Sequence, residues 1–245
     1  MITIRYFSDL HLEMIRVQGT KVMDCLFQEI PPGPGEICIL AGDIGCPTHL
    51  NYDLFMEFIS RSFKKTFVIA GNHEYYGRPM DETRDFMKSY FEKFHNITFL
   101  DNTWEIYEGY CFVGTTLWSQ VTDPTFKIND VFRIPGLDVE EYNRLHHTCV
   151  EFLDTLNQEN CIVITHHLPS RSLIHERYLT STMRPYHQWF ASDLDLFRSN
   201  IKAWFYGHTH TPSETTILGI PCLCNPIGYP GENKTLDFGK TRILE

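Results

Sequence analysis

Aspartate, asparagine and histidine residues recur directly after apolar runs at five places in this sequence. They are Asp9, His11, Asp43, Asn72, His73, His166, His208 and His210. Carboxylate and amide oxygens combined with imidazole nitrogens favour Mn, Fe, Zn or Ni over metals that select thiolates. A carboxylate such as Asp43 has two oxygens and can bridge the ions of a dinuclear centre. The residue types therefore predict a site for divalent metal ions, provided that the fold brings the five places together.

The stretch Gly71-Asn72-His73-Glu74 indicates how the fold could do so. It follows Thr66–Ala70, an apolar, β-branched run that is typical of a buried parallel strand. Open α/β sheets bind ligands in the crevice at the carboxyl ends of such strands. One Asn-His pair alone is more often part of a solvated loop, and the pair Asp9 and His11 alone would fit a capping aspartate beside a surface histidine. Recurrence at five strand ends favours a metal site over both alternatives.

The apolar runs predict an α/β fold. Buried strands are expected at 2–7, 37–41, 66–70, 161–165 and 203–206, each followed by one of the polar groups. Helices are expected at 51–63, 80–94 and 139–158, with a short helix over 192–200. Further strands are expected at 97–100, 103–107, 110–115, 214–218, 220–225 and 236–244, with Glu108-Gly109 as a hairpin turn. This order of elements suits one domain over residues 1–245.

Three stretches, 12–35, 116–137 and 168–191, have no clear period and are predicted to be irregular. The first of them ends in Pro31-Pro32-Gly33-Pro34-Gly35, a loop by composition. His146 and His147 lie at the flank of the predicted helix 139–158, and both are expected to be surface or boundary residues.

Composition restricts the partners that the chain suits. Hydrophobic residues make up 42% of the 245 residues, the net charge is −10, and the pI is about 5.6. An acidic chain is poorly suited to bind nucleic acid, which requires a basic face. Nucleic acid is therefore disfavoured as a partner, although a bound metal ion can still attract phosphate.

The eight cysteines form no Cys-x-x-Cys pair. Cys38, Cys111 and Cys161 lie in apolar runs, where a free thiol packs as a small hydrophobic group. Cys222 and Cys224 would project to one face of a strand, as a pair of buried thiols in preference to a metal site. A reducing, cytoplasmic location is expected, because the N-terminal segment is too short and mixed for a signal peptide. No apolar run approaches the ~20 residues that span a bilayer, so no membrane partner is expected.

The order of the motifs resembles the calcineurin-like metallophosphoesterase superfamily. The matching residues are Asp-x-His at 9–11, Gly-Asp at 42–43, Gly-Asn-His-Glu at 71–74, His166 and Gly-His-x-His at 207–210. Segments 114–118, 191–194 and 225–232 are similar to a small, uncharacterised bacterial-type branch, in which an arginine is expected where Ile227 stands. The resemblance implies a four-layer αββα sandwich of two mixed sheets flanked by helices. It also implies a metal-dependent phosphoric ester hydrolase.

The resemblance implies a role for each residue that matches a motif. Asp9, His11 and His210 would hold one divalent ion, Asn72, His166 and His208 a second, and Asp43 would bridge both. His73 would not be a ligand; it would act as general acid or stabilise charge building on the phosphate, while a metal-bridging hydroxide attacks the phosphorus. Mn is expected for the two ions, with Fe, Zn or Ni as alternatives.

The second motif departs from one branch of the superfamily. Protein Ser/Thr phosphatases have Gly-Asp-x-x-Asp-Arg-Gly there, whereas this chain has Gly42-Asp43-Ile44-Gly45-Cys46-Pro47. The arginine that grips phosphate and the acid that orients the catalytic histidine are both missing, which argues against a protein phosphatase. Glu74 or another carboxylate is left to orient His73.

The leading hypothesis is a phosphomonoesterase or phosphodiesterase acting on a small phosphate ester. A nuclease is the alternative within this chemistry, disfavoured by the net charge and the absence of a basic stripe. A non-catalytic, metal-bound scaffold, like the metallophosphoesterase-like subunit of retromer, is the alternative outside it, but such proteins usually lose the catalytic histidine or several ligands. We expect 116–137 and 168–191 to wall the metal site, with Arg133, Arg171, Arg177 or Arg184 available for a phosphate. The alternative is that these loops only cover the core.

Overall fold

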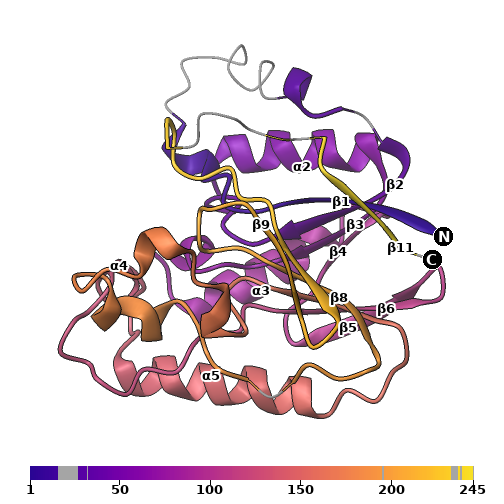
Figure 1. Cartoon of the computed structure of the whole chain (residues 1–245). Helices are drawn as coiled ribbons and strands as arrows, with labels where there is room; N and C mark the ends of the chain where they lie inside the picture. The colour runs from indigo at the N-terminus through magenta and orange to yellow at the C-terminus, as the bar shows by residue number, and fades with distance from the viewer. Residues whose placement is uncertain (16–26, 32, 195, 233–236, 238, 245) are drawn as a thin grey trace.

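Two β-sheets lie face to face between layers of helices in the computed structural model of this chain (Figure 1). The structure describes residues 1–15, 27–31, 33–194, 196–232, 237 and 239–244. The first sheet has the strand order β11-β1-β2-β3-β4 and the second β5-β6-β7-β8-β10-β9, and each combines parallel with antiparallel pairs. The predicted α/β sandwich of two mixed sheets is confirmed.

The strands have the following bounds. In the first sheet they are β1 (Ile2–Phe7), β2 (Gly33–Ala41), β3 (Phe63–Ile69), β4 (Ile97–Phe99) and β11 (Thr241–Leu244). In the second they are β5 (Thr103–Tyr107), β6 (Tyr110–Thr115), β7 (Cys161–Thr165), β8 (Ile201–Tyr206), β9 (Ser213–Ile217) and β10 (Ile220–Cys224). Strand β2 begins inside the segment 31–35 that was predicted to be a loop. Strand β11 is shorter than the predicted 236–244, of which residues 236 and 238 lie outside the described residues.

Helices cover the outer faces of both sheets. The α-helices are α2 (Leu50–Ser62), α3 (Met80–Phe91), α4 (Asn129–Arg133) and α5 (Val139–Asp154). The 3-10 helices are η1 (Leu12–Met14), η2 (His73–Tyr75), η3 (Arg171–Leu173), η4 (Glu176–Tyr178) and η5 (Arg184–Trp189). Helices α2 and α3 pack on the first sheet, and α5 lies along the second (Figure 1). No helix among the described residues is long and apolar enough to cross a bilayer.

The space between the sheets is filled by side chains that alternate along the strands. The ring of Phe67 on β3 stacks on that of Phe112 on β6 with centroids 4.0 Å apart, and Tyr6 on β1 meets Phe205 on β8 edge to face at 5.0 Å. Such aromatic pairs help to pack the two sheets against each other. Parallel pairing within each sheet gives its strands a common direction, and the carboxyl ends of β1, β2, β3, β7 and β8 face the end of the molecule that carries α4 and residues 168–191 (Figure 1).

The short helix predicted over 192–200 is wrong, because the described residues of this stretch are not helical. Ser192 and Asp193 have the residue types of a helix start, but they are used elsewhere. The amide of Ser192 donates to the Leu168 carbonyl at 3.1 Å, and the Asp193 carboxylate accepts from the Arg171 amide at 2.9 Å. The segment is therefore tied across the 168–191 loop instead of winding into a helix.

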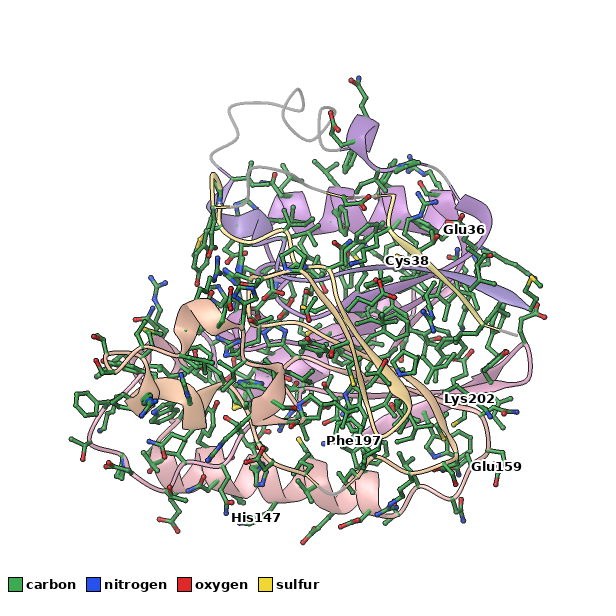
Figure 2. All side chains as sticks on the ribbon, viewed as in Figure 1. Glu36, Cys38, His147, Glu159, Phe197 and Lys202 are labelled. Atoms are coloured by element: carbon green, nitrogen blue, oxygen red, sulfur yellow. The ribbon has the colours of Figure 1, made fainter. Side chains whose placement is uncertain are left out.

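One of the two histidines expected at the surface or boundary of α5 is buried. The ring of His146 is only 5% exposed, and its Nδ1 donates to the Trp118 carbonyl at 2.7 Å. That hydrogen bond satisfies an imidazole that helical periodicity alone assigns to the flank of the helix. His147 is exposed on the outer side of α5, as predicted (Figure 2).

Candidate metal centre

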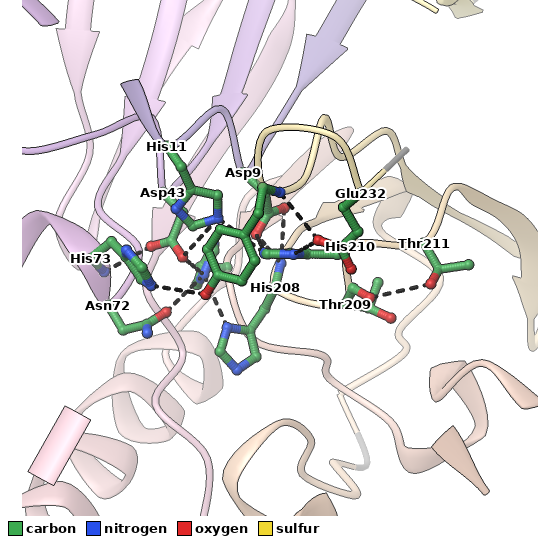
Figure 3. A network of polar contacts seen from close by, with 12 residues as sticks. Asp9, His11, Asp43, Asn72, His73, His208, Thr209, His210, Thr211 and Glu232 are labelled. Carbon is green, nitrogen blue, oxygen red and sulfur yellow. Dashed lines mark hydrogen bonds and ion pairs between the residues drawn. The ribbon is translucent and has the colours of Figure 1, made fainter. Parts of the chain in front are cut away.

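The eight residues singled out in the sequence lie together at the carboxyl ends of strands from both sheets. Asp9 and His11 follow β1, Asp43 follows β2, Asn72 and His73 follow β3, His166 follows β7, and His208 and His210 follow β8. Their side chains converge and are linked by hydrogen bonds and ion pairs, and Figure 3 labels all of them except His166, whose ring contacts Asn72 and Asp43. The sequence-level expectation that five separate strand ends would meet is confirmed.

One group of donor atoms is formed by Asp9, His11 and His210. His11 Nε2 lies 3.0 Å from His210 Nε2, which in turn lies 3.4 Å from Asp9 Oδ1. Two imidazole nitrogens at this distance require a proton or a cation between them, since two lone pairs repel each other. The chemistry of this donor set therefore fits a divalent ion.

A second group is formed around His166. Its Nε2 lies 3.0 Å from Asn72 Oδ1, 3.2 Å from His208 Nδ1 and 3.3 Å from Asp43 Oδ2. Asp43 Oδ2 also lies 4.0 Å from His11 Nε2 of the first group. Asp43 thus stands between the two groups, which is the placement that a bridging carboxylate needs.

Burial and charge act in opposite directions on the shared carboxylate. Burial opposes ionisation of Asp43, but the positive charges of His166 and His73 hold its pKa well below the usual range. Burial likewise opposes ionisation of Asp9, and its contact with His210 lowers the pKa of Asp9 below the usual value. Both carboxylates are therefore ionised at neutral pH, as metal ligands must be.

The backbone at these positions is strained. Asp9, His11, Asp43, His208 and His210 all have left-handed conformations with φ between 48° and 69°. Such conformations cost of order 1–3 kcal/mol for residues other than glycine, and they cluster at functional sites. The backbone at Gly71 also approaches Asp43 closely, which only glycine permits, because a Cβ at this position would lie 2.2 Å from Asp43 Oδ1. The fold therefore accepts local strain in order to aim these side chains inward.

Three further hydrogen bonds fix the orientation of candidate ligands from outside. His166 Nδ1 donates to the Ala41 carbonyl at 2.9 Å, and His210 Nδ1 donates to Glu232 at 2.7 Å. Asn72 Nδ2 donates to Asp130 Oδ1 at 2.8 Å, which leaves Asn72 Oδ1 facing His166. Partners of this kind set the tautomer and direction of metal ligands.

His73 lies beside these groups and is held by a carboxylate that the sequence left unidentified. Its Nδ1 is 3.0 Å from Glu13 Oε1, its Nε2 is 3.4 Å from the Tyr229 hydroxyl, and its backbone amide donates to Asp43 Oδ1 at 2.8 Å. Burial opposes ionisation of Glu13, but its contacts with His11 and His73 lower the pKa of Glu13 to about 2. Burial would lower the pKa of His73, yet Asp43 and Glu13 together raise it above the usual value.

Glu74, the carboxylate considered first for this role, has a different partner set. It accepts hydrogen bonds from the backbone amides of Asp43, Ile44, Gly45 and Gly71 at 2.7–3.3 Å. A single buried side chain thereby joins the loop after β2 to the loop after β3. Glu74 stabilises the position of Asp43 and does not contact the His73 ring through any described hydrogen bond.

We expect Glu74→Ala to lower the free energy of unfolding by about 3–5 kcal/mol, because it leaves four buried amides without an acceptor. Glu74→Gln should cost less, since its amide oxygen still accepts. Urea unfolding in the presence of a chelator measures this effect without a contribution from metal loss. Glu151→Ala, at an exposed position of α5, is the matched control and should change stability by less than about 0.5 kcal/mol. Equal stability of the Glu74 and Glu151 variants would contradict this role.

A cavity of about 410 Å³ opens beside the candidate metal centre. Its apolar and aromatic wall is formed by Tyr76, Ile128, Leu168, Ile174, Tyr178, Tyr186, Phe190 and Tyr229. Both long loops contribute to this wall, as predicted. Arg133, Arg171, Arg177 and Arg184 are not among the described residues that line the cavity, whereas Lys127 is. The guanidinium of Arg177 instead donates to Glu232 and to the His210 carbonyl, at 3.2 Å each.

The segment 225–232 covers the centre from the C-terminal part of the chain. Its backbone is tied to the end of β1, since the Ile227 amide donates to the Ser8 carbonyl at 3.0 Å and the Gly228 amide to the Asp9 carbonyl at 2.9 Å. This places the Tyr229 ring with its centroid 4.5 Å from that of His11 and 4.6 Å from that of His210. Tyr229 and Glu232 are thus site residues, and although their segment resembles the bacterial-type branch, the resemblance assigned neither of them a role.

This chain is similar to known proteins both in sequence and in fold. The sequence profile of calcineurin-like phosphoesterases matches residues 2–212. An uncharacterised protein of Acanthamoeba polyphaga mimivirus, L509, is 31% identical over 270 residues, covering 96% of this chain and 94% of that protein. Tyr229 and Glu232 lie beyond the residues that the family profile matches.

Two solved structures show the same fold at low sequence identity. Phosphopantetheinyl hydrolase from Mycobacterium tuberculosis superposes with a TM-score of 0.70 at 18% identity, over 93% of this chain and 90% of that one. The protein TT1561 of Thermus thermophilus gives a TM-score of 0.55 at 11% identity, over 92% of this chain and 89% of that one.

Proposed function

The chain belongs to the calcineurin-like phosphoesterase family, and we propose that it is a metal-dependent hydrolase of small phosphate esters. The observation that carries this proposal is the pair of donor groups that share Asp43. Asp9, His11 and His210 would hold one ion and Asn72, His166 and His208 the other. Two divalent ions supply neutralisation of phosphoryl charge and activation of a water nucleophile. Manganese is our first expectation, with iron, zinc or nickel as alternatives.

The chain's own residues would bind and orient the ester. His73 is held by Glu13 on one ring nitrogen and presents the other toward the cavity, where a protonated imidazole can donate to the departing oxygen. The aromatic wall would exclude water from one side of the substrate and pack against its organic group. Glu232 and Asp130 keep two of the candidate ligands aimed inward.

Two features favour a small ester over a polymer. The cavity of about 410 Å³ is the size of a small-molecule site, and the chain carries a net charge of −10. A nucleic acid would instead require a basic surface along its backbone. Nuclease activity is therefore the second hypothesis. Hydrolysis of single-stranded DNA or RNA in the assays would support it.

Hydrolysis assays with the purified protein test the proposal. The metal-loaded protein should hydrolyse bis-p-nitrophenyl phosphate or p-nitrophenyl phosphate, and chelation should abolish turnover until the metal is restored. A panel of nucleotides, cyclic nucleotides, sugar phosphates and phosphopantetheinyl compounds would then identify the ester class; the last are included because of the fold shared with phosphopantetheinyl hydrolase. Failure on every ester with Mn, Fe, Zn and Ni would favour the scaffold alternative.

We expect Lys127→Ala to raise KM for an anionic substrate about three- to tenfold while kcat changes little. Lys127 is exposed and lines the cavity, so its charge would serve binding in both ground and transition states. Steady-state kinetics at low and high salt measure the effect. Lys202→Ala, on an exposed position of β8, is the control and should leave KM unchanged (Figure 2). Identical KM values in the two variants would exclude a substrate role for Lys127.

A further inference from the structure

The carboxylate that contacts His73 comes from just after the first motif of the chain and not from the second motif. Glu13 is two residues beyond His11, in η1, and its Oε1 lies 3.0 Å from His73 Nδ1. In the second motif, Cys46 stands where protein phosphatases of the superfamily have the acid that orients the histidine. The Cys46 thiol lies 3.4 Å from the Thr48 hydroxyl and shows no described contact with His73.

The backbone fixes Glu13 relative to the loop that carries Asp43. The amides of His11 and Leu12 donate to the carbonyls of Asp43 and Ile44 at 3.0 Å each. Gly45 leaves the space for the carboxylate, since a Cβ there would lie 3.0 Å from Glu13 Oε2 and 3.1 Å from Leu12 Cβ. The glycine in the second motif and the glutamate after the first motif are therefore complementary in shape.

The contact also determines which nitrogen of His73 faces the cavity. A carboxylate can only accept, so Glu13 fixes the proton of a neutral His73 on Nδ1. The backbone amide of His73 is already bonded to Asp43 Oδ1 at 2.8 Å, which anchors the other end of the residue. Nε2 is then left 3.4 Å from the Tyr229 hydroxyl, on the side of the cavity.

We propose that Glu13 is the positioning residue for His73, replacing the acid that the second motif lacks. The expected effect of Glu13 on the rate rests on the proposed function, whereas its effect on the orientation of the His73 ring does not. Glu13 acts through the imidazole and touches neither substrate nor the reacting atoms. Removing Glu13 should therefore lower the rate by no more than removing His73 itself does.

A double-mutant cycle separates action through His73 from action through the metal site, since Glu13 Oε1 also lies 3.7 Å from His11 Nδ1. Glu13→Ala, which removes the acceptor, is expected to lower kcat on an alkyl phosphate ester by roughly 10- to 100-fold, the range for losing a partner that orients a functional imidazole. In a His73→Asn background the same change should alter kcat less than about twofold, because the residue it acts through is gone. Losses that multiply would overturn the proposal.

Metal content distinguishes a second possibility, because Glu13, His11 and His73 are themselves close enough to hold an ion. Elemental analysis of the holoenzyme should give the same number of ions per chain for the wild type, Glu13→Gln and His73→Asn. Loss of an ion from both variants would make Glu13 and His73 ligands and overturn the positioning role. Glu57→Gln, in an exposed i,i+4 pair with Arg61, is the control for a charge change alone.

A readout without turnover keeps this inference separate from the proposed function. In nitrogen NMR spectra of histidine-labelled, zinc-loaded protein, His73 should show a protonated Nδ1, and its signals are assigned by their absence in His73→Asn. Glu13→Gln should keep this tautomer, because its amide oxygen still accepts, whereas Glu13→Ala should lose it. An Nε2 tautomer in the wild type would overturn the inference whether or not the protein hydrolyses any ester.

Discussion

Replacing Asp43 by alanine is expected to remove at least one of two metal ions from the protein and to reduce phosphate-ester turnover at least about 1,000-fold. Asp43 Oδ2 lies 3.3 Å from His166 Nε2 and 4.0 Å from His11 Nε2, so each donor group loses an oxygen in this variant. The charge stabilisation that a metal ion provides in the transition state is worth several kcal/mol, and each 1.36 kcal/mol is about tenfold in rate. Elemental analysis after gel filtration, together with kcat, measures both losses.

Two controls show that the Asp43 effect is local. Asp43→Asn keeps an oxygen that can accept from the His73 amide, as Asp43 Oδ1 does at 2.8 Å, but it carries no charge. Asp43→Asn should fold like the wild type but bind metal more weakly than the wild type does. Asp154→Ala, at the exposed end of α5 where Asp154 pairs with Arg198, should change neither metal content nor rate. A folded Asp43→Ala protein that retained two ions per chain would falsify the bridging role.

The second large effect is expected for His73→Asn, on esters with poor leaving groups. The variant should keep both ions, because Asn72 and not His73 faces His166, at 3.0 Å. Proton donation in the transition state is typically worth 10²–10⁴-fold, so turnover of alkyl phosphate esters should fall by roughly this factor. Loss on p-nitrophenyl esters should be smaller, because p-nitrophenolate leaves without a proton.

Comparing esters with different leaving groups distinguishes proton donation by His73 from two other roles, charge stabilisation and metal binding. Equal losses on alkyl and p-nitrophenyl esters would mean that His73 stabilises charge on the phosphoryl group instead of protonating the leaving oxygen. A fall in metal content would make His73 a ligand. Either result would refute the general-acid role while leaving the dinuclear site intact as a hypothesis.

The residues that sequence patterns could predict share one property: each directly follows a buried strand. Periodicity locates strands, parallel strands present their carboxyl ends together, and Asp, Asn and His there are unusual enough to be noticed. This reasoning found the eight candidate residues that follow strand ends, from Asp9 to His210, and the structure brings them together. It also predicted that residues 116–137 and 168–191 would wall the site, because long irregular stretches are uncommon in compact domains and are usually functional.

Residues outside this pattern could not be found in the same way. Glu13 and Glu232 are ordinary glutamates in sequence, and they matter only because the folded chain places them against His73 and His210. Asp130 is buried beside Asn72, 58 positions away, with no periodic signal. The helix predicted from Ser192 was wrong for the related reason that its capping residue types are bonded to another segment. Long-range contacts decided each case, and local sequence does not report them.

The residues of the centre are scattered along almost the whole chain. The Asp9 carboxylate accepts from the His208 amide at 3.0 Å across 199 positions of sequence, so the donor set exists only when both sheets have docked. A metal ion that binds the native chain alone shifts the unfolding equilibrium, by about 2.7 kcal/mol at a free concentration 100 times its Kd. In the proposed metal-bound protein, that gain would offset part of the left-handed backbone strain described above. With metal bound as proposed, metal starvation in a cell would raise the unfolded fraction and expose the chain to proteolysis, so the amount of the protein would fall as well as its activity.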